Sequence, residues 1–120
     1  MAKRVLIVED NPLLQETLQV LLRKAGIEYQ VALNGAEAME RLQSFTPDVI
    51  FLDLVMPVMD GYQVLELLRA RDHGLPIIIM TNLDRADAQQ KCLELGATDF
   101  VVKSDTSVQQ IKEKIAEYLI

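Results

Sequence analysis

Continuous apolar runs are the clearest pattern in this chain. Residues 5–8, 49–52 and 77–80 are each four apolar side chains, mostly β-branched or aromatic, with no polar residue between them. Runs of this length and type predict strands that are buried on both faces, as in a parallel sheet. Residues 29–33 and 99–102 predict two further short strands, which brings the expected number of strands to five.

Between these strands, apolar residues recur at helical spacing and predict five helices. The first helix begins at Asn11-Pro12, a favourable N-cap followed by a residue suited to the first helical position, and runs to residue 24 before Gly26. The others are expected at 36–43, from residue 60 or 61 onward, at about 85–95, and after a capping box at 106–109. The residues expected to face the core or mark the apolar stripes of these helices include Leu14, Leu18, Leu21, Leu22, Ala38, Met39, Leu42, Val64, Leu65, Leu68, Val108, Ile111, Ile115 and Leu119.

The alternation of strands and helices predicts an α/β fold. Connections of this length between consecutive strands are right-handed crossovers, so the sheet is expected to be parallel and doubly wound, with helices on both faces. A chain of 120 residues matches the usual size of one domain, and no repeat, linker or change in composition divides it. Residues 1–120 are therefore expected to form a single domain.

Polar residues follow four of the predicted strands at the point where each strand ends. Glu9 and Asp10 follow the first strand, Asp53 the third, Thr81 the fourth and Lys103 the fifth. The carboxyl ends of parallel strands lie along one edge of a sheet, where open α/β sheets bind their ligands. The sequence therefore predicts that three carboxylates, one hydroxyl and one ammonium group converge in one crevice.

This combination of groups suggests phosphoryl chemistry. Crowded carboxylates raise one another's pKa unless a cation joins them, and an all-oxygen site suits magnesium. Asp53 would be the nucleophile, because carboxylates form aspartyl-phosphates. Magnesium and Lys103 would neutralise the phosphoryl oxygens, and Thr81 would donate a hydrogen bond to one of them.

Each of these residues also has an ordinary structural interpretation. An aspartate after a strand is usually a turn former, a lone lysine is usually surface charge, and a threonine often ends a strand. On one edge and in this order, the ordinary interpretations become improbable together.

Composition and charge exclude several other functions. The net charge of −6 argues against direct nucleic-acid binding, which depends on clustered Lys and Arg. No apolar run approaches the roughly 20 residues that span a bilayer, and the start of the chain lacks a signal-peptide pattern, so we expect a cytoplasmic protein that is not bound to a membrane. One cysteine and one histidine allow neither an internal disulfide nor a structural zinc site.

The sequence resembles, over its whole length, the receiver domain of two-component response regulators of the chemotaxis-regulator type. The residues that carry the resemblance are Glu9-Asp10, Asp53 followed by Met56-Pro57 and Asp60-Gly61, Thr81, the run from Leu95 to Phe100, and Lys103. The resemblance implies a flavodoxin-like five-stranded sheet in the order 2-1-3-4-5. It also implies that Asp53 accepts a phosphoryl group from a histidine kinase or histidine phosphotransfer protein, and that Glu9, Asp10, Asp53 and the backbone carbonyl of Val55 hold magnesium.

The resemblance further implies a switch and two partner surfaces. Thr81 would move toward the phosphoryl group and Phe100 would turn inward, which would change the affinity of the face made by the fourth helix, fifth strand and fifth helix for a downstream protein. We expect a phospho-acceptor that catalyses only its own phosphorylation and hydrolysis, rather than a metabolic enzyme. Asn11, Pro12 and Gln15, beside the crevice, are our candidates for contacts with the kinase.

The sequence departs from the family pattern at the edge of the site. Ser104 stands where the family has a proline joined by a cis bond, and a cis bond to a non-proline residue costs about 2.5–4 kcal/mol. Asn82 replaces a small residue and is expected to screen entry to the site partly. Val55 and Leu83 occupy positions that tune hydrolysis, and neither can orient a water molecule, so we expect slow dephosphorylation.

Three alternative functions are weighed against this one. A phosphatase of the haloacid dehalogenase type needs a second acid two residues after the nucleophile, where this chain has Val55. A flavodoxin-like flavin binder needs a Ser/Thr/Gly-rich phosphate loop after the first strand, where this chain has Glu9-Asp10-Asn11-Pro12. The third alternative is a degenerate receiver that acts as a docking or dimerisation module without phosphorylation, and the complete acceptor set argues against it.

Overall fold

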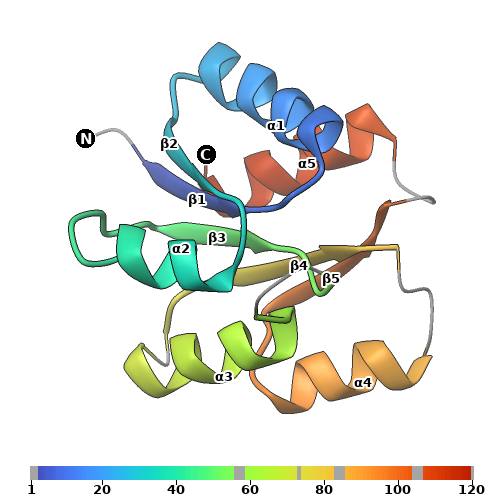
Figure 1. The fold of residues 1–120 in the computed structure, drawn as a ribbon. Coiled ribbons are helices and arrows are strands. Elements are labelled where there is room, and N and C mark those ends of the chain that lie inside the picture. Colours follow the sequence, from blue (N-terminus) through green and yellow to red (C-terminus); the bar gives the residue numbers. More distant parts are fainter. Residues whose placement is uncertain (1–2, 56–58, 73, 83–85, 104–106, 120) are drawn as a thin grey trace.

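The computed structural model describes residues 3–55, 59–72, 74–82, 86–103 and 107–119. In this part of the chain a five-stranded parallel sheet has the strand order β2-β1-β3-β4-β5 (Figure 1). The predicted α/β class, the parallel sheet and its order are therefore confirmed. The strands are β1 (Arg4–Val8), β2 (Glu28–Ala32), β3 (Val49–Leu52), β4 (Ile77–Thr81) and β5 (Asp99–Val102).

The helices alternate with the strands along the chain, as the apolar pattern predicts. They are α1 (Pro12–Lys24), α2 (Gly35–Arg41), α3 (Gly61–Arg71), α4 (Ala86–Glu94) and α5 (Val108–Leu119). None of the helices in the described residues is long and apolar enough to cross a membrane.

The sheet separates two hydrophobic clusters, one under each helical layer. Helices α1 and α5 cover one face, and α2, α3 and α4 cover the other (Figure 1). Successive strand residues point to opposite faces, so Val5 and Ile7 of β1 pack under α1 and α5, whereas Leu6 and Val8 pack on the other side. This burial on both faces is the physical reason why the strands are continuous apolar runs.

Side-chain caps and two glycines define the helix ends. The Asn11 side chain accepts hydrogen bonds from the first turn of α1, and Asp60 forms a capping box with Gln63 at the start of α3. Gly26 and Gly96, which follow α1 and α4, have φ values of 73° and 103°, a region that disfavours residues with a Cβ. The capping box of α5 joins Ser107 and Gln110, one residue later than predicted; Thr106 is outside the described residues.

The predicted bounds of two elements are wrong. Strand β2 begins and ends one residue earlier than predicted, and Leu33 lies beyond its end and is 49% exposed. Helix α2 is Gly35–Arg41 instead of the predicted 36–43. Val108 marks the start of α5 as predicted, although it is 52% exposed. Both errors occur at element ends, where the spacing of apolar residues carries the least information.

A polar contact fastens β5 to α5 at the edge of the sheet. The Asp99 carboxylate accepts hydrogen bonds from the Lys114 ammonium at 2.5 Å and from the Tyr118 hydroxyl at 3.0 Å. Burial alone would raise the pKa of Asp99, but the hydrogen bonds from Lys114, the Phe100 backbone and Tyr118 outweigh it and lower the pKa. The ionised form of Asp99 is therefore the form that stabilises the fold.

We predict that Asp99→Asn lowers the free energy of unfolding by about 1–2 kcal/mol near neutral pH, because charged hydrogen bonds are lost. Since the folded-state pKa of Asp99 is lowered, its contribution is present above the unfolded-state pKa of about 3.9 and disappears as the pH falls through the folded-state value. Urea unfolding measured across this range should show the difference between wild type and variant shrinking below about pH 4.

Glu66→Gln is the control for this measurement, because Glu66 is an exposed carboxylate on α3. It should leave the stability near neutral pH almost unchanged. A difference between wild type and Asp99→Asn that stays constant down to strongly acidic pH would contradict the role given to the carboxylate.

Candidate functional site

The carboxyl edge of the sheet gathers the polar residues predicted to meet there. A cavity of about 280 Å³ opens at this edge. It combines residues that follow β1, β3 and β5 with the last residue of β4, so four strands contribute to it. The residues that line it are Glu9, Asp10, Asn11, Asp53, Val55, Thr81, Asn82 and Lys103.

Lys103 links two buried carboxylates at the centre of this cavity. Its ammonium nitrogen lies 2.8 Å and 2.9 Å from the two carboxylate oxygens of Glu9 and 3.3 Å from Oδ2 of Asp53. Glu9 is 2% exposed and Asp53 is 5% exposed. Two carboxylates buried this deeply need a cation, and in this structure the ammonium of Lys103 supplies it.

Two hydrogen bonds from residues that follow β1 hold Glu9 in position. The Glu9 carboxylate accepts a hydrogen bond from the Asn11 backbone at 3.2 Å, and the Gln15 side chain on α1 donates to the Glu9 carbonyl. Burial raises the pKa of Glu9 to about 7; the Lys103 ammonium opposes this and the nearby Asp53 charge adds to it. Glu9 is therefore a carboxylate that gains from a further cation in the cavity.

Asp53 is positioned by its own backbone and by a glycine. Its N–H donates to the Val8 carbonyl at 3.0 Å, and its Oδ1 accepts from the Val55 backbone at 3.3 Å. Helix α3 begins directly against this turn. The approach is so close that a Cβ on Gly61 would lie 2.4 Å from the Asp53 carbonyl oxygen and 2.5 Å from Cα of Leu54. Only glycine permits this approach, so Gly61 determines where Asp53 lies.

Three carboxylates form a group that can bind a metal ion. One oxygen from each of Glu9, Asp10 and Asp53 lies within 4.8 Å of the others. Asp10 is exposed, so the group opens to solvent on one side. Carboxylate oxygens with room for water are the donor set that magnesium prefers, so the residues fit the predicted ion.

The remaining predicted residues of the site lie around the cavity in different environments. Thr81 is fully buried at the end of β4, whereas Asn82 and Val55 are exposed at the rim. That a carbonyl of Val55 binds metal, and that Asn82 screens entry, stay predictions. Leu83 and Ser104, and with it the state of the Lys103–Ser104 bond, lie outside the described residues.

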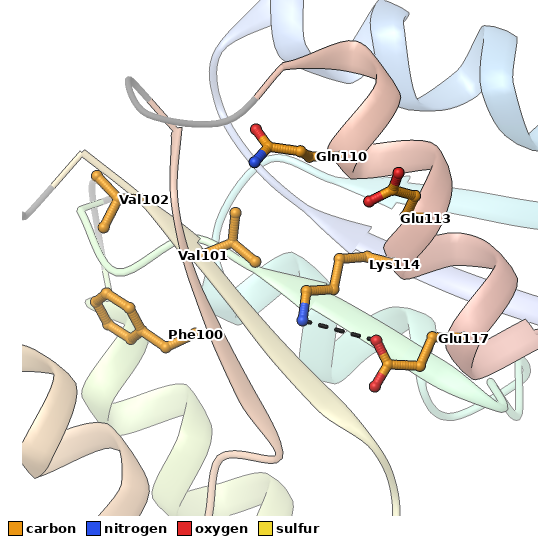
Figure 2. A pocket seen from close by; sticks show the side chains of 7 residues that line it. All are labelled: Phe100, Val101, Val102, Gln110, Glu113, Lys114 and Glu117. Atoms are coloured by element: carbon orange, nitrogen blue, oxygen red, sulfur yellow. Dashed lines mark ion pairs between the residues drawn. The ribbon is translucent and has the colours of Figure 1, made fainter.

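Phe100 does not line the acidic cavity. It lies in β5, partly buried against the cluster beneath α2, α3 and α4, and it borders a separate groove between β5 and α5 (Figure 2). Lys103 follows the end of the same strand. The strand therefore connects Phe100 to the site without direct contact.

A second cavity, next to the first, contains residues that the sequence analysis missed. It has a volume of about 400 Å³ between α1 and α5, and it shares Asn11, Asn82 and Lys103 with the acidic cavity. Leu13, which is 74% exposed, and Val108 are its apolar rim. The only sequence signal for Leu13 is an apolar residue off the core-facing stripe of α1.

The fold and the acidic site place the chain among open α/β domains that have a carboxylate cluster at the carboxyl edge of a parallel sheet. The family described as the response regulator receiver domain matches residues 5–116 of the chain. The chain therefore belongs to the response regulator receiver domain family, whose members are phospho-acceptors of two-component signalling and bind magnesium at their acidic site.

Curated relatives agree with this assignment. The transcriptional regulatory protein PrrA of Mycobacterium leprae is 39% identical over 100 residues, which cover 83% of this chain and 43% of PrrA. A protein-glutamate methylesterase/protein-glutamine glutaminase of Archaeoglobus fulgidus is 37% identical over 120 residues, which cover 98% of this chain and 34% of that protein. The chain thus spans less than half the length of these relatives.

Solved structures of receiver domains have the same fold. Chemotaxis protein CheY4 of Vibrio cholerae superposes with a TM-score of 0.90 at 27% identity, covering 99% of this chain and all of CheY4. The receiver domain of the sensor histidine kinase PA1611 of Pseudomonas aeruginosa superposes with a TM-score of 0.84 at 26% identity, with 98% of each chain covered. That structure has a magnesium ion coordinated in its active-site cleft.

We predict that Gly61→Ala destabilises the protein by about 1–3 kcal/mol, because the new methyl group overlaps the backbone of Asp53 and Leu54. Displacement of that backbone should also weaken magnesium binding, which isothermal titration calorimetry can measure. Gly74→Ala is the matched control, because the nearest atom to its added Cβ is 3.7 Å away. Equal losses of stability in the two variants would contradict the close approach at Gly61.

Proposed function

We propose that this chain accepts a phosphoryl group on Asp53 from a phosphohistidine of a kinase or phosphotransfer protein. The observation that supports this most strongly is the position of Lys103, whose ammonium lies 3.3 Å from Asp53 inside an acidic cavity. An oxygen of Asp53 attacks the phosphorus, the donor's N–P bond breaks, and the imidazole nitrogen keeps the bonding electrons and takes a proton. The product is an acyl phosphate on Asp53.

Glu9, Asp10 and Asp53 are the residues that would hold magnesium, and the carbonyl of Val55 completes the proposed set. When bound, the ion neutralises negative charge on the phosphoryl oxygens. Lys103 supplies a second positive charge, and Thr81, buried at the end of β4, offers a hydroxyl on the same cavity. These groups surround the position at which charge develops during transfer.

The proposed consequence of phosphorylation is a change in partner binding that involves β4 and β5. We propose that Thr81 moves toward the phosphoryl group, that Phe100 turns inward, and that the face of α4, β5 and α5 then changes its affinity for a downstream protein. The Phe100 side chain is only partly buried against the cluster beneath α2, α3 and α4, so part of its ring is still exposed and could become more buried. In this proposal residues 1–120 act as one receiver domain in the cytoplasm and bind no nucleic acid or membrane directly.

The family assignment supports a receiver over the phosphatase and the flavin binder. A receiver that only docks or dimerises would not need a complete acceptor set, yet the cavity contains all three carboxylates and Lys103. We therefore propose a phospho-acceptor that turns over no separate substrate.

We predict that incubation with acetyl phosphate and magnesium adds one phosphoryl group to the wild-type protein, measured by intact mass, and adds none to Asp53→Asn. Asp48→Asn is the matched control, because Asp48 lies at the opposite end of β3, where its carboxylate accepts a hydrogen bond from the Arg4 backbone. Phosphorylation of the Asp53 variant, or loss of phosphorylation in folded Asp48→Asn, would contradict the assignment. After removal of the donor the phosphoryl group should persist, since Val55 at the rim cannot orient a water molecule.

We also propose where the phosphodonor docks. The sequence suggests Asn11, Pro12 and Gln15. Asn11 and Pro12 are exposed at the start of α1, but the Gln15 side chain donates a hydrogen bond to the Glu9 carbonyl. The apolar rim formed by Leu13 and Val108 is better suited, because exposed apolar side chains beside an active cavity mark interaction sites.

We predict that Leu13→Asp slows phosphotransfer from a phosphorylated histidine phosphotransfer protein about tenfold or more, because a charge enters the apolar contact. Leu67→Asp is the matched control, since Leu67 is 46% exposed on α3 and does not line this cavity. Parallel phosphorylation by acetyl phosphate separates loss of docking from damage to Asp53. Equal transfer rates for the two variants would remove the rim from the docking surface.

A further inference from the structure

A cavity between α1 and α5 opens directly beside the acidic site. This space, the α1–α5 cavity, has a volume of about 400 Å³ and shares Asn11, Asn82 and Lys103 with the acidic cavity. The two helices that form it lie on the same side of the sheet (Figure 1). The other residues that line it are Leu13, Leu14, Thr17, Met80, Val108 and Ile111.

The reacting carboxylate lies on the same side of the sheet as this cavity. Along β3, Phe51 packs under α1 and α5, and Asp53 comes two residues later. The N–H of Asp53 continues the sheet by donating to the Val8 carbonyl, so the alternation of side chains extends to Asp53. Along β5, Val101 also packs under α1 and α5, and Lys103 follows it by two residues. A molecule that reacts at Asp53 therefore has the α1–α5 cavity as its neighbouring space.

The two adjoining cavities differ in chemistry. The acidic cavity combines three carboxylates with Lys103, which suits magnesium and a phosphoryl group. The α1–α5 cavity has buried Met80 and Ile111 in its wall and exposed Leu13 and Val108 at its rim. A cavity of about 150 Å³ is enough for an aromatic ring, so this one accepts a bulky apolar group that an acetyl group does not match. A ligand that fills both cavities has a phosphoryl group at one end and an apolar group at the other.

We propose that, among small acyl phosphates, Asp53 prefers donors whose acyl group is apolar and occupies the α1–α5 cavity. An oxygen of Asp53 attacks the phosphorus, the bond between the phosphorus and the bridging oxygen breaks, and the acyl carboxylate leaves with the bonding electrons. No proton has to move in this step. The inference rests on the proposed function, because it names the class of small-molecule donor for the same site.

The residues that the two cavities share lie where the leaving carboxylate would form. The Lys103 ammonium, 3.3 Å from Asp53, can neutralise the charge of this group, and the Asn82 amide at the rim can donate a hydrogen bond to it. Leu13 and Val108 would cover the apolar acyl group and withdraw its surface from water. The preference therefore comes from contacts with the acyl group, of which acetyl phosphate offers a single methyl.

The test compares benzoyl phosphate with acetyl phosphate as donors in the presence of magnesium. Time courses of intact mass give the second-order rate constant of phosphorylation with each donor, and they separate phosphorylation from acylation of lysines because the added masses differ. The quantity of interest is the ratio of the two rate constants, benzoyl over acetyl. Because the two donors differ in intrinsic reactivity, this ratio is compared between the wild type and variants, where that difference cancels.

Two variants change the cavity in opposite ways. Leu13→Asn/Val108→Asn removes its apolar rim and should lower the ratio about five- to tenfold. Thr17→Phe places a ring inside the cavity in competition with the acyl group and should also lower the ratio. Leu67→Asn/Leu93→Asn is the matched control, because these leucines are 46% and 45% exposed on α3 and α4 and do not line the cavity; the ratio should stay nearly unchanged.

Equal ratios in the wild type and in both cavity variants would overturn the inference, because the acyl group would then not occupy the cavity. An equal fall in the two double variants would overturn it as well, since the effect would not be local. In either case, phosphorylation of the wild type but not of Asp53→Asn by acetyl phosphate leaves the proposed function standing. A folded wild-type protein that neither donor phosphorylates would contradict the proposed function, and the inference with it.

Discussion

The burial of two carboxylates beside one lysine is the constraint on which the rest of the structure depends. Glu9 and Asp53 are almost completely withdrawn from solvent, although ionised groups lose much free energy when they leave water. The arrangement is tolerable because Lys103, from the far edge of the sheet, reaches both. Its reach requires β1, β3 and β5 to end at the same level, which only a parallel sheet in the observed order provides.

The strand that precedes Lys103 also carries Phe100, the proposed switch residue. Alternation along β5 directs Asp99 and Val101 toward α5 and the core beneath it, and Phe100 toward the opposite cluster. Asp99 fastens the strand to α5 through Lys114. The attachment of β5 to α5 therefore depends on an ion pair as well as on the apolar packing of Val101.

Much of the fold and of the site could be predicted, because both are expressed by residue types at fixed spacings. Strands buried on both faces must be continuous apolar runs, and residues that end parallel strands must meet at one edge. The acidic group of Glu9, Asp10 and Asp53 follows from the same logic and is present in the structure.

What could not be predicted depends on distances through space. Gln15 is a polar residue on a helix start, and only the folded chain shows that its side chain donates to Glu9 rather than facing a partner. Leu13 and Val108 have the right residue type for a core, but each lies in the first turn of its helix and is exposed. Gly61 reads as an ordinary turn glycine until the backbone of Asp53 is placed against it.

Glu9 and Asp53 compete for the Lys103 ammonium, and the proposed phosphorylation would change this competition. At present its ammonium is shared, closer to Glu9 than to Asp53. A phosphoryl group on Asp53 adds negative charge on that side, so the balance of attraction for Lys103 shifts away from Glu9. The carboxylate of Glu9, whose pKa burial already raises, would then lose its nearest cation, which favours a metal ion beside it. Because Lys103 directly follows β5, a shift of its side chain is the route by which the proposed phosphorylation would reach the strand that carries Phe100.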